Sequence, residues 1–152
     1  MLKLRIITAV VLAAVSLWAI YGWPTLLFGL FLLVATACCA YEWSSLLNIE
    51  SPVIKYTYIG AATVITALLL WLDNTEWLRA MALIAVLCWI AILLDLILRP
   101  VIARVEQVRP GLLLLATFIL VTTVVSLYWM REHYSAHVIV YVIALVAAAD
   151  IG

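Results

Sequence analysis

The sequence predicts an all-α protein that crosses a membrane about six times. Hydrophobic residues make up 70% of the 152 residues and the mean hydropathy is +1.30, whereas soluble domains are typically about 45–50% apolar. The apolar residues fall into runs long enough to cross a bilayer, with short polar links between them. Charged residues are only 11%, too few to cover a soluble domain of this size. We therefore expect a single transmembrane domain over residues 1–152.

The first two spans share one long uncharged stretch, residues 6–41. A spanning helix needs about 20 residues, so this stretch must be divided. Tyr21-Gly22-Trp23-Pro24 divides it, because Gly and Pro favour a turn and aromatic side chains favour the headgroup level. We expect spans at about Leu4–Ile20 and Thr25–Tyr41. The turn lacks the small-residue cleavage pattern of a signal peptide and a second span follows at once, so we predict that the first helix is retained.

The other spans follow from the same alternation of apolar runs and polar links. Residues 42–55 are predicted to link the second span to the third, and residues 131–137 to link the fifth to the sixth. Asn74 or Thr75 can cap the fourth helix, because short polar side chains accept hydrogen bonds from the first backbone amides. The four remaining spans are predicted at about Tyr56–Leu72, Trp77–Leu98, Gly111–Met130 and Val138–Ala149.

The distribution of Lys and Arg predicts a cytoplasmic amino terminus. With the amino terminus inside, the outer links hold only Arg79 and Arg131, two basic residues against six on the inner side. This is the positive-inside bias of membrane proteins. The sixth apolar run then returns inward, so Asp150 lies at or near the cytoplasmic end of its helix. The six inner basic residues are Lys3, Arg5, Lys55, Arg99, Arg104 and Arg109.

Asp150 is the strongest candidate for a functional residue, because it is a carboxylate at the end of an apolar run. An Asp at the centre of a membrane helix costs about 2.5–3.5 kcal/mol on insertion scales, and such residues by default mark functional sites. Carboxylate oxygens suit Mg²⁺, which typically binds one or two carboxylates together with substrate phosphates. The residues leave two interpretations open: a ligand for a metal or metal-bound phosphate, or a carboxylate that only reaches the membrane interface.

Two other acidic positions are weaker candidates. Asp95 and Arg99 lie four residues apart in an apolar run, so they share a helix face and we expect an interfacial ion pair. Glu42 lies between Tyr41 and Trp43. Tyr and Trp beside an acid are typical of an interfacial anchor, although a role near a site is also possible.

His133 and His137 have the spacing that places two imidazoles on one helix face for zinc. Glu132 is adjacent, but the order is not His-Glu-x-x-His and no third ligand is evident, so we do not expect a metal site here. Apolar runs also contain three cysteines, which we interpret as small hydrophobic residues. These are Cys38, Cys39 and Cys88.

The charge balance and the absence of several known motifs exclude several classes of protein. Eight basic residues balance eight acidic ones, so there is no basic excess to indicate a nucleic acid partner. The sequence has no glycine-rich phosphate loop, no Ser/His/Asp set, no Cys-x-x-Cys and no strong internal repeat. The inner basic strip either sets orientation alone or also attracts anionic headgroups or a nucleotide. The strip consists of Arg99, Arg104 and Arg109.

Three segments, in this order, resemble the phosphatidate cytidylyltransferase (CDP-diacylglycerol synthase) family. Met1–Ala9 resembles the family's basic opening into its first helix, and Tyr41-Glu42-Trp43 is similar to its Glu-Trp element. Ala148–Gly152 resembles its Ala-Asp-x-Gly motif, which is normally followed by Ala-Tyr. The order and spacing of the predicted spans fit the family across the whole chain.

The resemblance implies a reaction between CTP and phosphatidate that gives CDP-diacylglycerol and pyrophosphate in phospholipid biosynthesis. It implies dependence on Mg²⁺, a bacterial inner-membrane location and the capacity to form a homodimer. By resemblance, Asp150 is the catalytic and metal-binding residue of this segment. The expected partners are the lipid bilayer, phosphatidate and CTP, without nucleic acid.

The sequence departs from the family because members continue well past this point, with distal segments that carry most of the catalytic and metal-binding residues. We therefore expect the chain to be the amino-terminal membrane half of a longer enzyme, inactive as it stands. The alternative, from another class, is a small multipass protein without enzyme activity, such as an assembly factor or a transporter subunit. In that case Asp150 is an incidental charge, and the coding sequence downstream of codon 152 distinguishes the two.

Overall fold

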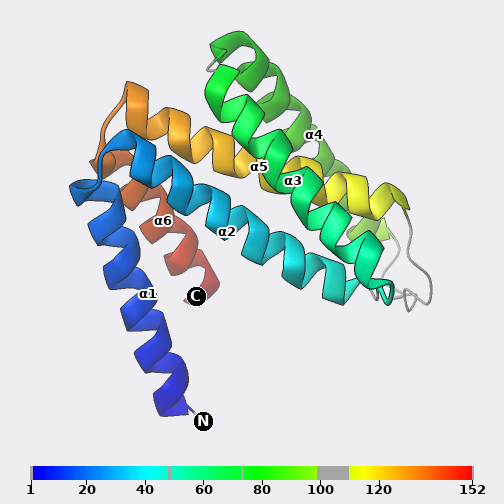
Figure 1. Cartoon of the computed structure of the whole chain (residues 1–152), viewed down its shortest axis with the longest axis horizontal. Coiled ribbons are helices and arrows are strands. Elements are labelled where there is room, and N and C mark those ends of the chain that lie inside the picture. Colours follow the sequence, from blue (N-terminus) through cyan, green and yellow to red (C-terminus); the bar gives the residue numbers. More distant parts are fainter. Residues whose placement is uncertain (1, 48, 73, 99–109, 152) are drawn as a thin grey trace. The chain divides into compact units, whose positions relative to one another are not determined.

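The computed structural model describes residues 2–47, 49–72, 74–98 and 110–151, and over these residues the protein is all-α, as predicted. The described residues form six helices in succession (Figure 1). The helices are α1 (Leu2–Gly22), α2 (Thr25–Leu46), α3 (Pro52–Leu72), α4 (Thr75–Leu98), α5 (Pro110–His133) and α6 (Ala136–Ile151).

Four of the described helices are long and apolar enough to cross a membrane. Their apolar segments have 21 or 22 residues, and a rise of about 1.5 Å per residue gives the roughly 30 Å of a hydrocarbon core. The chain is therefore a multi-pass membrane protein. The apolar described parts of α1 and α6 are shorter, so spanning by these two helices stays a prediction. The four segments are Thr25–Leu46, Pro52–Leu72, Thr75–Asp95 and Leu113–His133.

Two predicted links are partly helical, which corrects the expected boundaries. α2 continues through Glu42 to Leu46, and α5 continues through Arg131 to His133. No Gly or Pro interrupts either segment, so the backbone keeps its helical hydrogen bonds beyond the apolar run. α3 begins at Pro52, because proline suits the first helical position, where its missing N–H would have no partner anyway.

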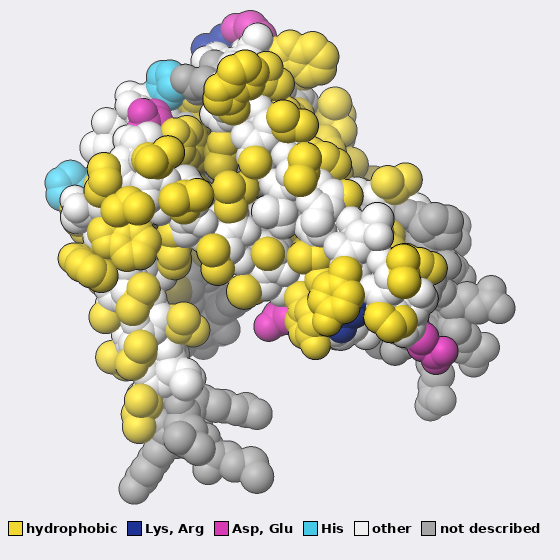
Figure 2. Space-filling model, in the orientation of Figure 1, with side chains coloured by type: hydrophobic (Ala, Val, Ile, Leu, Met, Phe, Trp, Pro, Cys, Tyr) yellow, Lys and Arg dark blue, Asp and Glu magenta, His cyan; other side chains and the backbone are white. Residues whose placement is uncertain are grey.

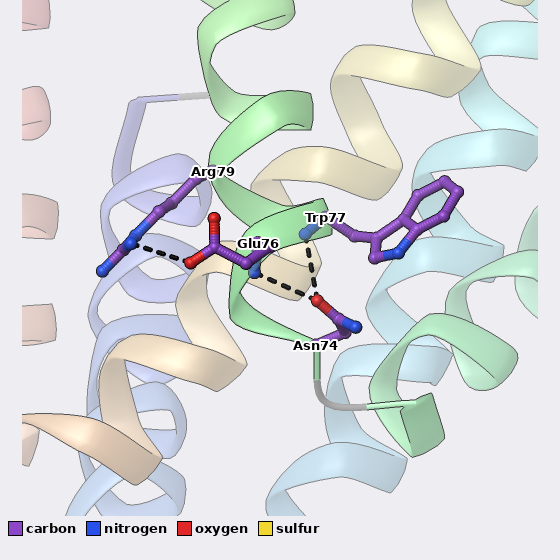
Figure 3. Close-up of polar contacts among 4 residues, drawn as sticks. All are labelled: Asn74, Glu76, Trp77 and Arg79. Atoms are coloured by element: carbon purple, nitrogen blue, oxygen red, sulfur yellow. Dashed lines mark hydrogen bonds and ion pairs between the residues drawn. The ribbon is translucent and has the colours of Figure 1, made fainter.

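The start of α4 shows which of the two predicted residues is the cap. Asn74 Oδ1 accepts hydrogen bonds from the backbone amides of Glu76 and Trp77, at 3.0 and 3.1 Å (Figure 3). Thr75 is the first helical residue, so Asn74 is the N-cap. In the first turn of the helix, the exposed side chains of Glu76 and Arg79 form an ion pair of 2.9 Å, and the negative charge of Glu76 complements the helix dipole.

The helices form two compact units, and the division falls within α2 and α5. One unit holds the residues up to Leu32 and from Leu127 onward, with Phe28 and Ile139 in its core. The other holds Leu33–Ser126, and small residues dominate its buried positions, including Thr36, Ala40, Ala62 and Thr66. Small side chains let helices in membranes approach closely. The single transmembrane domain stays a prediction.

Large apolar side chains cover the outside of these helices. Figure 2 shows hydrophobic side chains spread over the visible face, with few charged ones among them. Trp71 is 82% exposed, Leu98 77% and Leu26 75%. Water solvates so large an apolar surface poorly, whereas lipid chains solvate it well. The surface therefore fits the interior of a bilayer.

Candidate functional site

The start of α6, the helix that carries Asp150, is fixed against the end of α1. Tyr21 Oη and His137 Nδ1 share a hydrogen bond of 2.8 Å, and the two helices are in contact. Asp150 follows His137 by 13 residues, a rise of about 20 Å. If Tyr21 marks one side of a hydrocarbon core of about 30 Å, position 150 lies about 10 Å short of the other side.

The helical register places Asp150 on a particular face of α6. Ile139 is only 1% exposed, and Asp150 follows it by 11 residues, which is close to three full turns. Tyr141 is 68% exposed and lies two and a half turns from Asp150, on the opposite face. Ionisable residues in membrane helices usually face the protein interior or a water-filled cavity. The residues on the same face that lie nearest to Asp150, Ile143 and Val146, are 44% and 56% exposed, so this face is not buried along its whole length. The side chain of Asp150 lies outside the described part of the structure, and its role stays a prediction.

A second group of polar residues surrounds the turn between α2 and α3. Because α3 begins soon after α2 ends, Lys55 in the first turn of α3 lies beside the last turns of α2. Lys55 Nζ donates a hydrogen bond of 3.0 Å to Ser45 Oγ and lies 3.7 Å from the centre of the Tyr41 ring. Such a cation–π contact contributes about 0.5–1 kcal/mol at an exposed site. From the sequence, Lys55 indicates only the orientation of the chain, and nothing local to it predicts this arrangement.

A groove of about 420 Å³ opens next to this cation, between α2 and α3. Its walls are almost entirely apolar, and Glu42 supplies a charged group to its lining. Glu42 is exposed and forms no hydrogen bond or ion pair with another described residue. Glu42 therefore borders a space that a ligand can enter, and its role, as an interfacial anchor or near a site, stays a prediction. The residues that line this α2–α3 groove are Ala37, Cys38, Tyr41, Glu42, Tyr56 and Ile59.

In the other unit, Arg131 near the end of α5 binds the end of α1. Its Nε donates a hydrogen bond of 3.1 Å to the Ile20 carbonyl, and Nη2 donates to the Trp23 carbonyl. The guanidinium also lies 4.5 Å from the centre of the Phe28 ring. The last carbonyls of a helix have no partner within it. Arg131 provides a charged donor to one of them, that of Ile20, and to the Trp23 carbonyl in the turn after α1. Sequence reasoning missed this role because nothing local to Arg131 indicates which turn it meets.

The contacts of this unit bring together the helix ends that the topology assigns to one side of the membrane. Thr25 Oγ1, at the start of α2, donates a hydrogen bond of 2.7 Å to Glu132 near the end of α5. The end of α1 meets the start of α6 through Tyr21 and His137. The predicted alternation of spans places these four ends on one side of the membrane, and the contacts are consistent with that placement. Which of the two sides is cytoplasmic stays a prediction.

The same unit gives no support to zinc binding at the two histidines. His133 stacks on Trp129 with 4.4 Å between ring centres, and its Nδ1 donates to the Trp129 carbonyl. His137 is bonded to Tyr21 instead. Among the described residues, no three His, Cys, Asp or Glu side chains gather as a metal site.

The other predicted residues are only partly described. Asp95 is exposed in α4, and Arg99, its predicted partner, lies outside the described residues. Arg104 and Arg109 also lie outside them, so the ion pair and the basic strip stay predictions. The three cysteines carry free thiols, and their interpretation as small hydrophobic residues stays a prediction.

Comparison with known proteins supports an enzymatic role. Residues 3–152 match the cytidylyltransferase family, which includes phosphatidate cytidylyltransferase. The match covers nearly the whole chain, and the chain belongs to this family, whose members are nucleotidyltransferases. No curated protein and no solved structure matches the chain significantly. The family resemblance predicted from three short segments is thereby confirmed.

Proposed function

We propose, from membership of the cytidylyltransferase family, that the chain forms the membrane part of a phosphatidate cytidylyltransferase active in phospholipid biosynthesis. The observation that carries the proposal is a cytidylyltransferase family match that extends through four helices long and apolar enough to span a bilayer. An enzyme embedded in this way has direct access to an acceptor that is itself a lipid. Phosphatidate is such an acceptor, and its phosphate lies at the membrane surface, where soluble CTP can reach it.

The proposed reaction exchanges one phosphoanhydride bond for another. An oxygen of the phosphatidate phosphate attacks the α-phosphorus of CTP, the bond to the β-phosphate breaks, and pyrophosphate leaves with the electron pair. Little covalent chemistry falls to the protein in phosphoryl transfer, so its part is to position the two substrates and to balance their negative charge. Charge repulsion between two phosphorylated substrates makes this balance the main requirement.

We propose Mg²⁺ as the metal of this reaction, with Asp150 as one of its ligands. Among the described residues no group of three possible metal ligands exists, but Mg²⁺ typically needs only one or two carboxylates plus substrate phosphates and water. When bound, the ion would neutralise charge on the reacting phosphates. Ionisable residues in membrane helices usually face the protein interior or a water-filled cavity, and this is the environment that we propose for the Asp150 carboxylate.

The proposal includes a location and an assembly. We place the protein in the bacterial inner membrane with its amino terminus in the cytoplasm, because the basic residues favour that orientation and CTP is available on that side. A homodimer is part of the proposal by family resemblance.

Membranes from cells that express the complete reading frame provide the test. With labelled CTP and phosphatidate, label should enter the lipid fraction while pyrophosphate is released, and Asp150→Asn should abolish both without reducing membrane insertion. Asp95→Asn is the matched control, since it removes an Asp from another apolar helix, and it should keep activity. Transfer to a soluble acceptor but not to phosphatidate would refute the proposed substrate, and full activity of Asp150→Asn would remove Asp150 from the mechanism.

A further inference from the structure

We propose that the α2–α3 groove binds one phospholipid of the surrounding bilayer, with an acyl chain in the groove and a phosphate–ammonium headgroup between Lys55 and Glu42. The inference depends on the membrane location and not on the proposed transfer reaction. It assigns a role to charged side chains that the reaction as proposed does not use.

The groove has the properties of an acyl-chain site. Its volume is about 420 Å³, it is shallow and broadly open, and its walls are mostly apolar. Ala37 and Cys38 belong to α2, which is long and apolar enough to cross the membrane, so the groove opens toward lipid and not toward water. An empty apolar groove in a bilayer would lose the packing contacts that its walls can make. A lipid chain restores those contacts.

The mouth of the groove lies at the level of lipid headgroups. Tyr41 and Tyr56 line this end, and both rings are largely exposed, at 48% and 67%. Tyrosine is enriched at membrane–water interfaces because its ring is apolar and its hydroxyl is polar. A phospholipid whose chain lies in the groove would therefore present its phosphate close to the tyrosines and to Lys55.

The charges at the mouth specify the headgroup. Lys55 Nζ has three N–H donors, of which one goes to Ser45 Oγ and none to a described carboxylate. Glu42 accepts no hydrogen bond from a described residue. A phosphate can take the free donors of Lys55, and a primary ammonium can donate to Glu42. Ethanolamine phospholipids carry both groups, whereas an anionic headgroup would meet repulsion from Glu42, and choline has no N–H to donate.

Photocrosslinking of the complete chain tests the proposal. The chain is placed in phosphatidylcholine vesicles that contain equal fractions of a diazirine-labelled phosphatidylethanolamine or phosphatidylglycerol, and crosslinked peptides are quantified. Groove peptides should be labelled about two- to fivefold more by the ethanolamine lipid, the factor expected for one partly exposed charge contact. Peptides from other lipid-facing surfaces should be labelled equally by both lipids.

Single substitutions distinguish the contribution of the groove to lipid binding from the contributions of the two charged side chains. Ala37→Phe fills the groove and should remove labelling of its peptides, while Ala61→Phe, at an exposed position of α3 outside the groove, should not. Glu42→Gln should abolish the preference for ethanolamine, and Lys55→Gln should lower labelling by both lipids, with helicity unchanged in circular dichroism. Equal labelling of the groove and of other surfaces, or stronger labelling by phosphatidylglycerol, would overturn the proposal, and neither result would bear on the transfer of cytidylyl groups.

Discussion

Replacement of Arg131 by alanine should be among the most destabilising single changes in the described helices. The guanidinium makes two hydrogen bonds to carbonyls at the end of α1 and in the turn after it, each worth about 1.5–3 kcal/mol for a charged donor. Its contact with Phe28 adds about 0.5–1 kcal/mol. Nη1 is buried without a hydrogen-bond partner among the described residues, so its removal relieves a desolvation cost of about 1–3 kcal/mol. The net expected loss is about 3 kcal/mol.

A second variant at Arg131 tests the geometry of these contacts, and a variant at Arg79 serves as the control. Arg131→Lys keeps the charge but not the fork that reaches both carbonyls, so it should lose about half as much stability. Arg79→Ala removes a cation whose ion pair with Glu76 is exposed, with side chains 68% and 79% accessible, and should cost at most about 0.5 kcal/mol.

Unfolding in mixed micelles with increasing denaturing detergent, followed by circular dichroism, measures these differences. Equal effects of Arg131→Ala and Arg79→Ala would refute the reasoning. So would a lysine variant as stable as the original protein, because the two-carbonyl geometry would then contribute nothing.

Three further variants should change the stability by smaller amounts that the same assay can measure. Asn74→Ala should cost about 1 kcal/mol, because the amides of Glu76 and Trp77 lose their acceptor; an unchanged midpoint would mean that water replaces the cap fully. Gly60→Ala should raise stability by up to about 1 kcal/mol, since nothing lies within 4 Å of the added Cβ. Gly29→Ala should gain less, because its Cβ would lie 3.3 Å from the Tyr128 ring; equal gains at both glycines would show that this ring moves freely.

The helices were predictable from the sequence because lipid imposes one rule. An apolar run of about 20 residues must be helical to satisfy its backbone, and breakers such as Gly22 and Pro24 then mark the turns. The ends were less predictable: the link expected after Tyr41 is helical to Leu46. Charge marks where a helix leaves hydrocarbon, but it does not stop the helix, because a helix can continue in headgroups or water when no breaker intervenes.

The candidate site residues likewise divide into those that the sequence indicates and those that it does not. Asp150 and Glu42 are candidates from the sequence alone, because an acid next to or within an apolar run is costly and needs a reason, and their roles stay predictions. Lys55 and Arg131 were assigned only to orientation, because their partners are on other helices. Lys55 meets Ser45 and Tyr41 across a turn, and Arg131 meets carbonyls more than a hundred residues away. Periodicity within one helix carries no information about such contacts.

The depth of Asp150 leads to a prediction about water. Position 150 lies about 20 Å from the level of Tyr21 along α6, so a carboxylate that serves phosphates there needs an aqueous path through about 10 Å of the membrane from the cytoplasmic side. With the three native cysteines replaced by alanine, Asp150→Cys in inside-out vesicles should react with a small membrane-impermeant thiol reagent. Tyr141→Cys, two and a half turns away on the exposed face, should not, because lipid covers it.

The same experiment tests the orientation of the protein when the reagent is applied from only one side of the membrane. Right-side-out vesicles should protect position 150 from the reagent, since the inner links hold six of the eight basic residues. Reaction from the outside only would reverse the orientation and place Asp150 away from CTP. No reaction from either side would mean that position 150 is enclosed in lipid or packed protein, where neither a nucleotide nor a hydrated Mg²⁺ could reach its carboxylate, and the assignment of Asp150 to the site would fail together with the depth argument that supports it.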